Sequence, residues 1–173
     1  VKSIIDIDIA TNLRPPEIVK IFPDSIIINE NFGTVLVRMK DENSQSFKEW
    51  EVTTLRSESN YTDGRSPDMV NFGDSIFEDI SRRDFTINAL SYCPFKEKIY
   101  DYFTGIKDLE LGLVRFIGNA NSRIMEDYLR ILRFFRFFGK FGKQIDVNSL
   151  DSCVKNREFI KKISKERIKS EFD

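Results

Sequence analysis

Two aspartates near the start of the chain have a spacing that suits metal chemistry. Asp6 and Asp8 interrupt the apolar run of residues 5–11, IDIDIAT, which is typical of a buried β-strand. Alternate side chains of a strand share one face, so the two carboxylates would lie about 6.6 Å apart along the backbone, with the isoleucines opposite. Such a pair can bind one hard divalent cation, or two Mg²⁺ ions, for phosphoryl or nucleotidyl transfer. The wet outer face of an edge strand produces the same pattern.

Composition restricts the other kinds of chemistry. The 173 residues include no histidine, which excludes Ser-His-Asp and Cys-His sites and leaves carboxylates as acids, bases and metal ligands. Cys93 and Cys153 lack C-x-x-C spacing, so we expect no structural zinc and a cytoplasmic, reducing location. No signal peptide opens the chain and no apolar run approaches the ~20 residues of a membrane span, so no membrane partner is expected. The length suits one ordinary domain, or one domain with part of a second.

Charge is distributed unevenly along the chain. Residues 1–114 contain 13 Lys and Arg against 20 Asp and Glu, whereas residues 115–173 contain 14 against 8. An acidic metal-dependent module followed by a basic segment that receives a polyanion would produce this pattern. Two ordinary solvated surfaces explain it equally well.

A third acid lies in a later strand. Residues 47–55 read as a strand that contains Glu51. If this strand lies beside the strand of Asp6 and Asp8, Glu51 would complete an acidic cluster that positions metals or a bound water. A glutamate on the solvent face of a strand is the simpler explanation.

Residues 81–90 combine several groups that bind nucleotides. Arg82 and Arg83 precede Asp84 and Asn88 within a helical apolar pattern. Arginine binds phosphate through its planar fork, and Asp or Asn can hydrogen-bond sugar hydroxyls. An Arg–Asp pair that caps a helix is the alternative.

A polar stripe follows the predicted helix of residues 123–137. Its members recur every three residues and are Asp127, Arg130, Arg133 and Arg136. The buried remainder of this helix is predicted to be Leu129, Ile131, Leu132 and Phe135. One acid with three arginines can offer acceptors and donors to a base edge and neutralise a triphosphate. A solvated face with i,i+3 ion pairs has the same spacing.

The remaining patterns indicate the elements that would hold these residues. Short strands are expected at 25–28 and 33–39, and a helix is expected to begin at Arg14-Pro15. The Ser-, Asn-, Asp- and Gly-rich span 56–74 is expected to be a mobile loop near the site. Further strands are expected at 91–95, 99–103 and 113–117, and helices follow to the end of the chain. A sheet with helical cover, followed by a helical segment, is implied.

Six ordered motifs resemble one family. They are residues 6–11 (DIDIAT), 51–56 (EVTTLR), 63–65 (DGR), 82–89 (RRDFTINA), 101–109 (D-x-x-x-G-x-x-D-L) and 126–133 (E-D-x-x-R-x-x-R). Residues 165–172, with K-E-R-I-x-x-E-F, resemble the family's last neck motif. In this order they resemble class II tRNA nucleotidyltransferases, the CCA-adding enzymes, and the related bacterial poly(A) polymerases. The resemblance covers nearly the whole chain.

The resemblance implies an α/β (α+β) nucleotidyltransferase head with a mixed sheet at residues 1–116, followed by an all-helical neck at residues 117–173. The implied activity is template-independent, Mg²⁺-dependent addition of CCA, from CTP and ATP, to the 3′ ends of tRNA. The resemblance also implies a role for each candidate residue. Asp6 and Asp8 would hold Mg²⁺ with support from Glu51, and ribose and phosphates would be bound by Arg83, Asp84 and Asn88. The base edge would pair with Asp127 and Arg130, and the triphosphate would contact Arg133 and Arg136.

Other activities remain open. The chain would also suit a poly(A) polymerase, a partial C- or A-adding enzyme, or a non-catalytic nucleotide- or RNA-binding remnant. The family's glycine-rich segment before the D-x-D strand, and its body and tail domains, are not in this sequence, so we expect a fragment. Phe32 and Ser66 stand where family members often carry histidine. The oligomeric state is not readable from the sequence.

Overall fold

The computed structural model describes residues 7–41 and 46–172. The chain divides into two compact units, one of Val1–Glu58 with Val70–Asp79 and one of Ser59–Met69 with Ile80–Asp173. Asp6, one of the two predicted metal ligands, lies outside the described residues. None of the helices in the described part of the chain has the length and apolar composition to span a bilayer.

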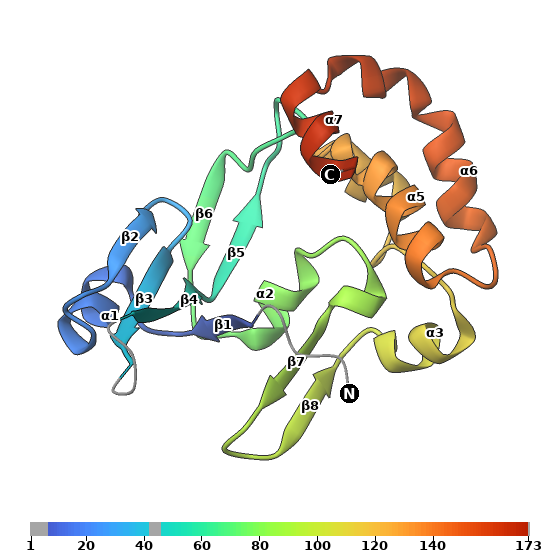
Figure 1. Cartoon of the computed structure of the whole chain (residues 1–173). Helices are drawn as coiled ribbons and strands as arrows, with labels where there is room; N and C mark the ends of the chain where they lie inside the picture. Colours follow the sequence, from blue (N-terminus) through green and yellow to red (C-terminus); the bar gives the residue numbers. More distant parts are fainter. Residues whose placement is uncertain (1–6, 42–45, 173) are drawn as a thin grey trace. The chain divides into compact units, whose positions relative to one another are not determined.

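The first unit is built on a mixed four-stranded sheet (Figure 1). Its order is β1 (Asp8–Thr11), β4 (Phe47–Thr54), β3 (Thr34–Lys40) and β2 (Ile26–Asn29). β1 runs parallel to β4, and the other neighbouring pairs are antiparallel. The predicted mixed sheet is therefore confirmed.

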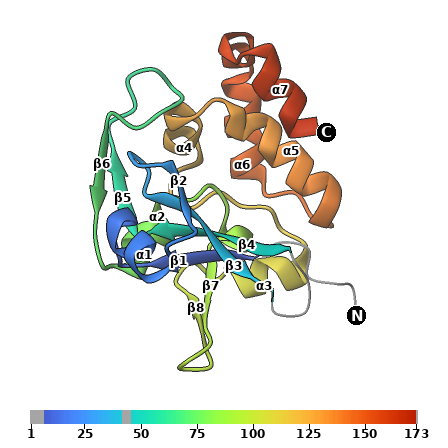
Figure 2. The same cartoon turned by 60° about the vertical axis from the view of Figure 1, so that its left-hand side comes forward.

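Helix α1 (Pro15–Ile21) covers one face of this sheet (Figure 2). Proline suits the first turn because its nitrogen has no hydrogen to leave unpaired, and the Glu17 carboxylate accepts the Arg14 amide at 2.7 Å. Ile18, which is 2% exposed, packs on alternate strand residues that face the helix. These are Val35, Val37 and Val52. The period-two pattern of β3 and β4 thus places their remaining side chains on the other face.

β1 is less buried than its sequence suggests. Ile7 and Ile9 are 50% and 41% exposed, so the prediction of a buried strand was wrong. The reason is that β1 is an edge strand, with β4 on one side only. An apolar run cannot reveal from sequence whether it lies at the centre or the edge of a sheet.

Residues 56–74 are not the single loop that was predicted. They form a hairpin of β5 (Arg56–Ser59) and β6 (Met69–Phe72). At its base, the Gly73 amide donates to the Leu55 carbonyl at 2.9 Å, and towards its tip the Asp68 amide donates to the Asn60 carbonyl at 2.7 Å. Strands of four residues, of which β5 is entirely polar, lack the alternation of apolar and polar residues from which a strand is predicted.

The longer segment of the second unit begins at the end of α2 (Ile76–Ser81), and a short 3-10 helix, η1 (Thr86–Asn88), follows. The helical pattern predicted for residues 81–90 is therefore wrong. Phe85 is extended, with φ −116° and ψ 151°, and it forms a β-bridge with Phe116. Within the described chain, the strand predicted at 113–117 is reduced to isolated bridges at Leu113 and Phe116. Pairing with a distant segment has overridden the local helical pattern.

The two strands predicted at 91–95 and 99–103 are present, with bounds shifted by one or two residues, and they form a hairpin. β7 (Leu90–Cys93) pairs antiparallel with β8 (Lys98–Asp101). Asp101 then begins α3 (Gly105–Leu111), because its carboxylate accepts the Gly105 and Ile106 amides at 2.7 and 3.1 Å.

Helix α3 is fastened to η1 by the remaining residues of this motif. The Asp108 carboxylate, which is 2% exposed, accepts the Thr86 hydroxyl at 2.7 Å. A Cβ on Gly105 would lie 2.1 Å from the Thr86 carbonyl oxygen, so a larger residue cannot take its place without moving backbone. The 101–109 motif therefore positions the turn that follows Asp84.

The C-terminal segment is helical, as predicted. It contains α4 (Ala120–Glu126), α5 (Leu129–Phe141), α6 (Val147–Lys155), the short η2 (Arg157–Lys162) and α7 (Lys165–Phe172). Figures 1 and 2 show α7 beside α5.

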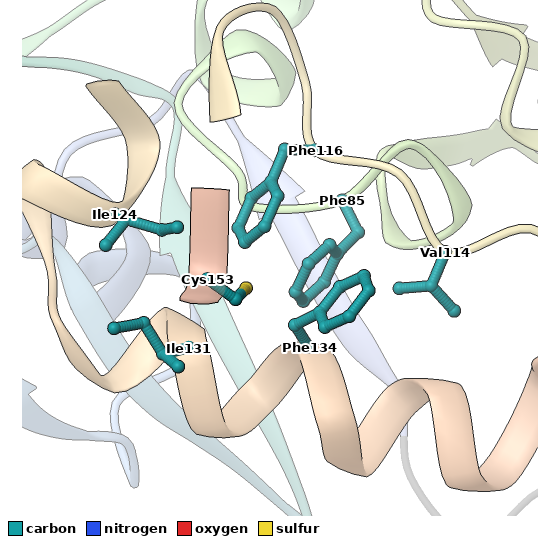
Figure 3. Packing of buried hydrophobic residues seen from close by; sticks show 7 residues of the cluster. All are labelled: Phe85, Val114, Phe116, Ile124, Ile131, Phe134 and Cys153. Atoms are coloured by element: carbon teal, nitrogen blue, oxygen red, sulfur yellow. The ribbon is translucent and has the colours of Figure 1, made fainter. Parts of the chain in front are cut away.

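The core of the second unit is aromatic. The rings of Phe85, Phe116 and Phe134 meet above α5, next to Cys153 of α6 (Figure 3). The ring centroids of Phe85 and Phe116 lie 4.7 Å apart, and those of Phe116 and Phe134 lie 6.0 Å apart. Both cysteines of the chain are free, and burial raises the pKa of the Cys153 thiol to about 12, so this thiol stays protonated and packs as an apolar group.

The single helix predicted for residues 123–137 is broken. Asp127 is extended, with φ −150° and ψ 111°, and its carboxylate accepts the Leu129 amide at 3.0 Å. Within α5 the side chains that face inward also differ from the prediction. Phe134 is 1% exposed, whereas Phe135, predicted to be buried, is 46% exposed. A residue that can cap the next helix has interrupted an otherwise continuous apolar pattern.

Candidate functional site

Glu51 lies beside Asp8, which is the condition that its predicted role required. β1 and β4 are parallel, and Asp8 lies directly opposite Glu51. Paired residues on neighbouring strands point to the same face, about 4.8 Å apart at the backbone. Both side chains are exposed, on the face opposite the Ile18 core, because Val52 next to Glu51 points inward. The strand pairing on which the role of Glu51 depended is therefore confirmed.

This pair has the chemistry of a magnesium site. Carboxylate oxygens are hard donors, and Mg²⁺ usually takes one or two of them together with waters and substrate phosphates. Over residues 7–41 and 46–172, no group of three or more acidic or cysteine side chains gathers as a closed metal site. An open pair of exposed acids fits a metal that arrives with a nucleotide.

In the second unit, Asp84 gathers several of the predicted residues around a buried carboxylate. The side chain is 5% exposed. One of its oxygens accepts the Asn88 amide nitrogen at 2.6 Å and the Phe85 backbone amide at 3.0 Å. The other accepts Nε of Arg133 at 2.5 Å. Arg83 lies beside this group, with Nη1 3.4 Å from the Asn88 carbonyl oxygen. Asp84 thus forms an ion pair with an arginine of α5.

Opposing effects act on the pKa of Asp84. Burial raises it, but the charge of Arg133 and the hydrogen bonds from Arg133 and Asn88 outweigh burial, so the net pKa lies below the ordinary value of 3.8. A carboxyl whose folded-state pKa is lowered contributes stability above its unfolded pKa, and this contribution is lost as the pH falls through the folded pKa.

We expect Asp84→Asn to lower the free energy of unfolding by about 2–3 kcal/mol at pH 7, because it removes a charged hydrogen-bond partner from Arg133. The difference from the unmodified chain should begin to shrink below about pH 4, where Asp84 of the unfolded chain becomes protonated, and should disappear once the pH falls through the lowered pKa of the folded state. Urea unfolding between pH 7 and pH 2.5 measures this. Asp151→Asn, an exposed acid on α6, is the control and should change little. A difference that stays constant with pH would contradict the assignment.

Two arginines of the predicted stripe also contact a buried acid of α7. Glu171 is 8% exposed, accepts Nε of Arg136, and has an oxygen 3.7 Å from Nη1 of Arg133. Burial lowers the pKa of Arg133, but the charge and hydrogen bond of Asp84, with the charge of Glu171, raise it overall. Sequence reasoning did not assign Glu171 a role, although the motif at 165–172 contains it.

Arg130 is held more tightly than a surface residue. It is 9% exposed, and its Nη1 donates to the Glu126 carboxylate at 2.5 Å and to the Arg123 carbonyl at 3.0 Å. Its Nη2 donates to the Arg82 carbonyl at 3.1 Å. A guanidinium held in this way is suited to hydrogen-bond the edge of a base, because the arginine side chain loses little further rotational freedom when the base binds.

Asp127 does not continue the stripe of α5. It lies in the break before that helix, so the stripe consists of Arg130, Arg133 and Arg136, which replaces the four-residue stripe predicted. The Asp127 carboxylate meets Arg167 of α7, at 2.8 Å from Oδ2 to Nη2.

The turn around Gly64 packs against the residue that follows Asp127. The Tyr128 amide donates to the Gly64 carbonyl at 3.1 Å, and a Cβ on Gly64 would lie 2.3 Å from the Tyr128 ring. The Asp63 carboxylate accepts the Arg65 and Ser66 amides, each at 2.8 Å, which fixes the turn. The DGR motif is therefore docked on the start of α5.

We expect Gly64→Ala to cost about 1–3 kcal/mol more than Gly118→Ala, because a Cβ at position 64 overlaps the Tyr128 ring. Both glycines have positive φ, +63° and +67°, but nothing lies within 4 Å of a Cβ at position 118. The comparison therefore separates steric overlap from backbone strain. Thermal and urea unfolding of the two variants measure it, and equal losses would show that the ring moves aside freely.

Comparison with known proteins gives consistent matches. Residues 1–115 match the family described as the poly A polymerase head domain. A CCA-adding enzyme from Enterococcus faecalis is 43% identical over 171 residues, and one from Lactobacillus johnsonii is 41% identical over 171 residues. These alignments cover 99% of this chain and 40% and 41% of the two relatives. The chain thus spans about two fifths of the length of these curated relatives.

Solved structures agree. The Bacillus stearothermophilus CCA-adding enzyme in complex with CTP superposes with a TM-score of 0.80 and is 33% identical. The match covers 96% of this chain and 38% of that structure. The fold class and the resemblance predicted from sequence are therefore confirmed.

Proposed function

The chain belongs to the poly A polymerase head-domain family, and from this membership we propose that it is the nucleotide-transferring part of an RNA nucleotidyltransferase. The proposed reaction is template-independent addition of CCA, from CTP and ATP, to the 3′ ends of tRNA. Its curated relatives named CCA-adding enzymes support this reaction over a poly(A) polymerase. The observation that carries the proposal is the pairing of Asp8 with Glu51, because it sets two exposed carboxylates side by side.

Mg²⁺ is the proposed metal, with Asp8 and the sequence-predicted Asp6 as its ligands and Glu51 as their support. A bound Mg²⁺ would lower the pKa of the RNA 3′-hydroxyl and neutralise charge on the departing pyrophosphate. The exposure of Asp8 and Glu51 leaves room for a triphosphate to complete the coordination.

The second unit is proposed to bind the nucleotide. Arg83 and Asn88 would contact ribose and phosphates, with Asp84 holding Asn88 and Arg133 in place. Asp127 and Arg130 would meet the Watson–Crick edge of the base, so that the protein replaces a template. Arg133 and Arg136 would face the triphosphate with the donors that Asp84 and Glu171 leave available. A base with the wrong pattern leaves buried donors unpaired, at about 1–3 kcal/mol each.

We further propose that residues 1–116 form the head and residues 117–173 the neck, which the family match over residues 1–115 supports. A cytoplasmic location is also proposed, because a reducing compartment keeps both cysteines free.

A chimera tests the activity. This chain replaces the matching residues of the Enterococcus faecalis relative, and the purified chimera is incubated with tRNA lacking CCA, CTP, ATP and Mg²⁺. Extension by three nucleotides supports the proposal, and absence of extension by a folded chimera contradicts it. Long tails formed with ATP alone would instead assign the poly(A) polymerase activity. Binding of CTP and ATP without turnover would indicate a non-catalytic remnant.

A further inference from the structure

The carboxylate of Asp127 is held from two sides. Oδ1 accepts the Leu129 amide at 3.0 Å and Nη2 of Arg167 at 3.1 Å, and Oδ2 accepts the same Nη2 at 2.8 Å. These contacts fix both the position of the group and the rotation of its plane.

Arg167 reaches this carboxylate from a distant part of the chain. It lies on α7, 40 residues after Asp127, and the two side chains are 24% and 19% exposed. A surface ion pair gains little stability, because water screens it and two side chains lose freedom. Here the pair is mostly buried, and its acid is the residue proposed to face the base.

The pair leaves Asp127 able to accept one further hydrogen bond. A carboxylate has about four acceptor positions, and the Leu129 amide and Arg167 use three contacts. The remaining capacity is on Oδ2, which has Arg167 as its sole protein donor among the described hydrogen bonds. An amino donor on a base can bind there.

Rotation of this carboxylate decides which bases it accepts. Cytosine and adenine present an amino donor where uracil and guanine present a carbonyl oxygen. Uracil and guanine nevertheless carry a ring N–H one position away, and a carboxylate free to rotate could accept it. A carboxylate held in place meets the carbonyl instead, which repels it and leaves both oxygens unpaired.

We infer that Arg167 is a positioning residue for base selection, fixing Asp127 so that bases with an amino group are bound in preference to those with a carbonyl. This inference rests on the proposed function. It gives Arg167, within the motif at residues 165–172, a role in base selection that was not predicted from the sequence.

Nucleotide binding by the chain of 173 residues tests the inference. CTP and UTP are titrated separately in the presence of Mg²⁺ by calorimetry, and the ratio of their dissociation constants is compared among variants. Arg167→Ala should reduce the preference for CTP about fivefold or more, a coupling typical of residues in direct contact. Arg157→Ala, an exposed arginine of η2 that donates to the Val154 carbonyl, is the control and should keep the ratio.

Two further variants separate positioning from folding. Arg167→Lys keeps the charge and the helical propensity of α7 but replaces the planar guanidinium whose Nη2 contacts both oxygens of Asp127, so the preference should fall between the two extremes even if Arg167→Ala does not fold. In an Asp127→Asn background, Arg167→Ala should change the ratio less than about twofold, because its target carboxylate is gone.

The outcomes are distinct. If the unmodified chain does not prefer CTP over UTP, the proposed function fails, and the inference fails with it. If the unmodified chain prefers CTP and both Arg167 variants weaken CTP and UTP equally, Arg167 is only structural and the inference alone is overturned.

Discussion

Replacement of Asp8 by Asn should abolish nucleotide transfer by the chimera while leaving its fold intact. Metal ions supply several kcal/mol of stabilisation to a phosphoryl-transfer transition state, so the loss should be on the order of 10³-fold or more in kcat. Stability should not change, because Asp8 is an exposed residue of an edge strand. Extension of tRNA in single-turnover reactions, with circular dichroism of the same samples, measures both effects.

Matched variants make this result specific. Asp24→Asn removes an exposed acid from the loop before β2 and should keep full activity. Glu51→Gln should reduce activity less than Asp8→Asn, because Glu51 is proposed to support the metal ligands and is not itself one of them. In this variant Asp8, the strand partner of residue 51, keeps its negative charge. Raising the Mg²⁺ concentration should recover part of the activity of Glu51→Gln. Full activity of Asp8→Asn would exclude the proposed metal role.

The largest effect on stability should come from Phe134→Ala. Its ring is 1% exposed, within the cluster of Figure 3, and lies 6.0 Å from the Phe116 ring and 6.3 Å from the Phe85 ring. Truncation removes this apolar contact and leaves a cavity, at a cost of about 3–5 kcal/mol. Because Arg133 precedes it on α5, the variant should also weaken binding of CTP. Urea unfolding monitored by circular dichroism measures the loss of stability.

Phe135→Ala is the matched control on the same helix. Its side chain is 46% exposed, so we expect a loss of about 1 kcal/mol or less. The sequence pattern assigned Phe135 to the buried face, so the two variants also decide between that prediction and the structure. A larger loss from Phe135→Ala than from Phe134→Ala would contradict the buried face described for α5.

Much of the fold followed from local pattern. Strands with period-two alternation, such as β3 and β4, were predicted because their side chains face a core on one side and water on the other, and the two strands β7 and β8 were predicted as well. The errors arose where a distant contact decided the conformation. Phe85 is extended because it pairs with Phe116, and β1 is exposed because it lies at the edge of the sheet formed by the described strands.

The amino-acid sequence by itself determined the chemical groups of this protein and their order along the chain. It sets Asp6 and Asp8 two residues apart, provides the arginines and the acid of residues 81–90, and excludes every site that needs histidine. The motifs also determined the family, which the comparisons confirm. These are properties of residue type and short spacing, and they need no knowledge of packing.

Only the tertiary structure decided which of these groups meet. Glu51 lies beside Asp8 because β1 pairs with β4 in parallel, and Asp84 forms an ion pair with Arg133 of α5. Arg167 reaches Asp127 because α7 packs beside α5. Each of these contacts joins residues about 40 positions or more apart. Which residues meet is decided by the packing of apolar side chains elsewhere in the fold, and local sequence spacing does not encode that packing.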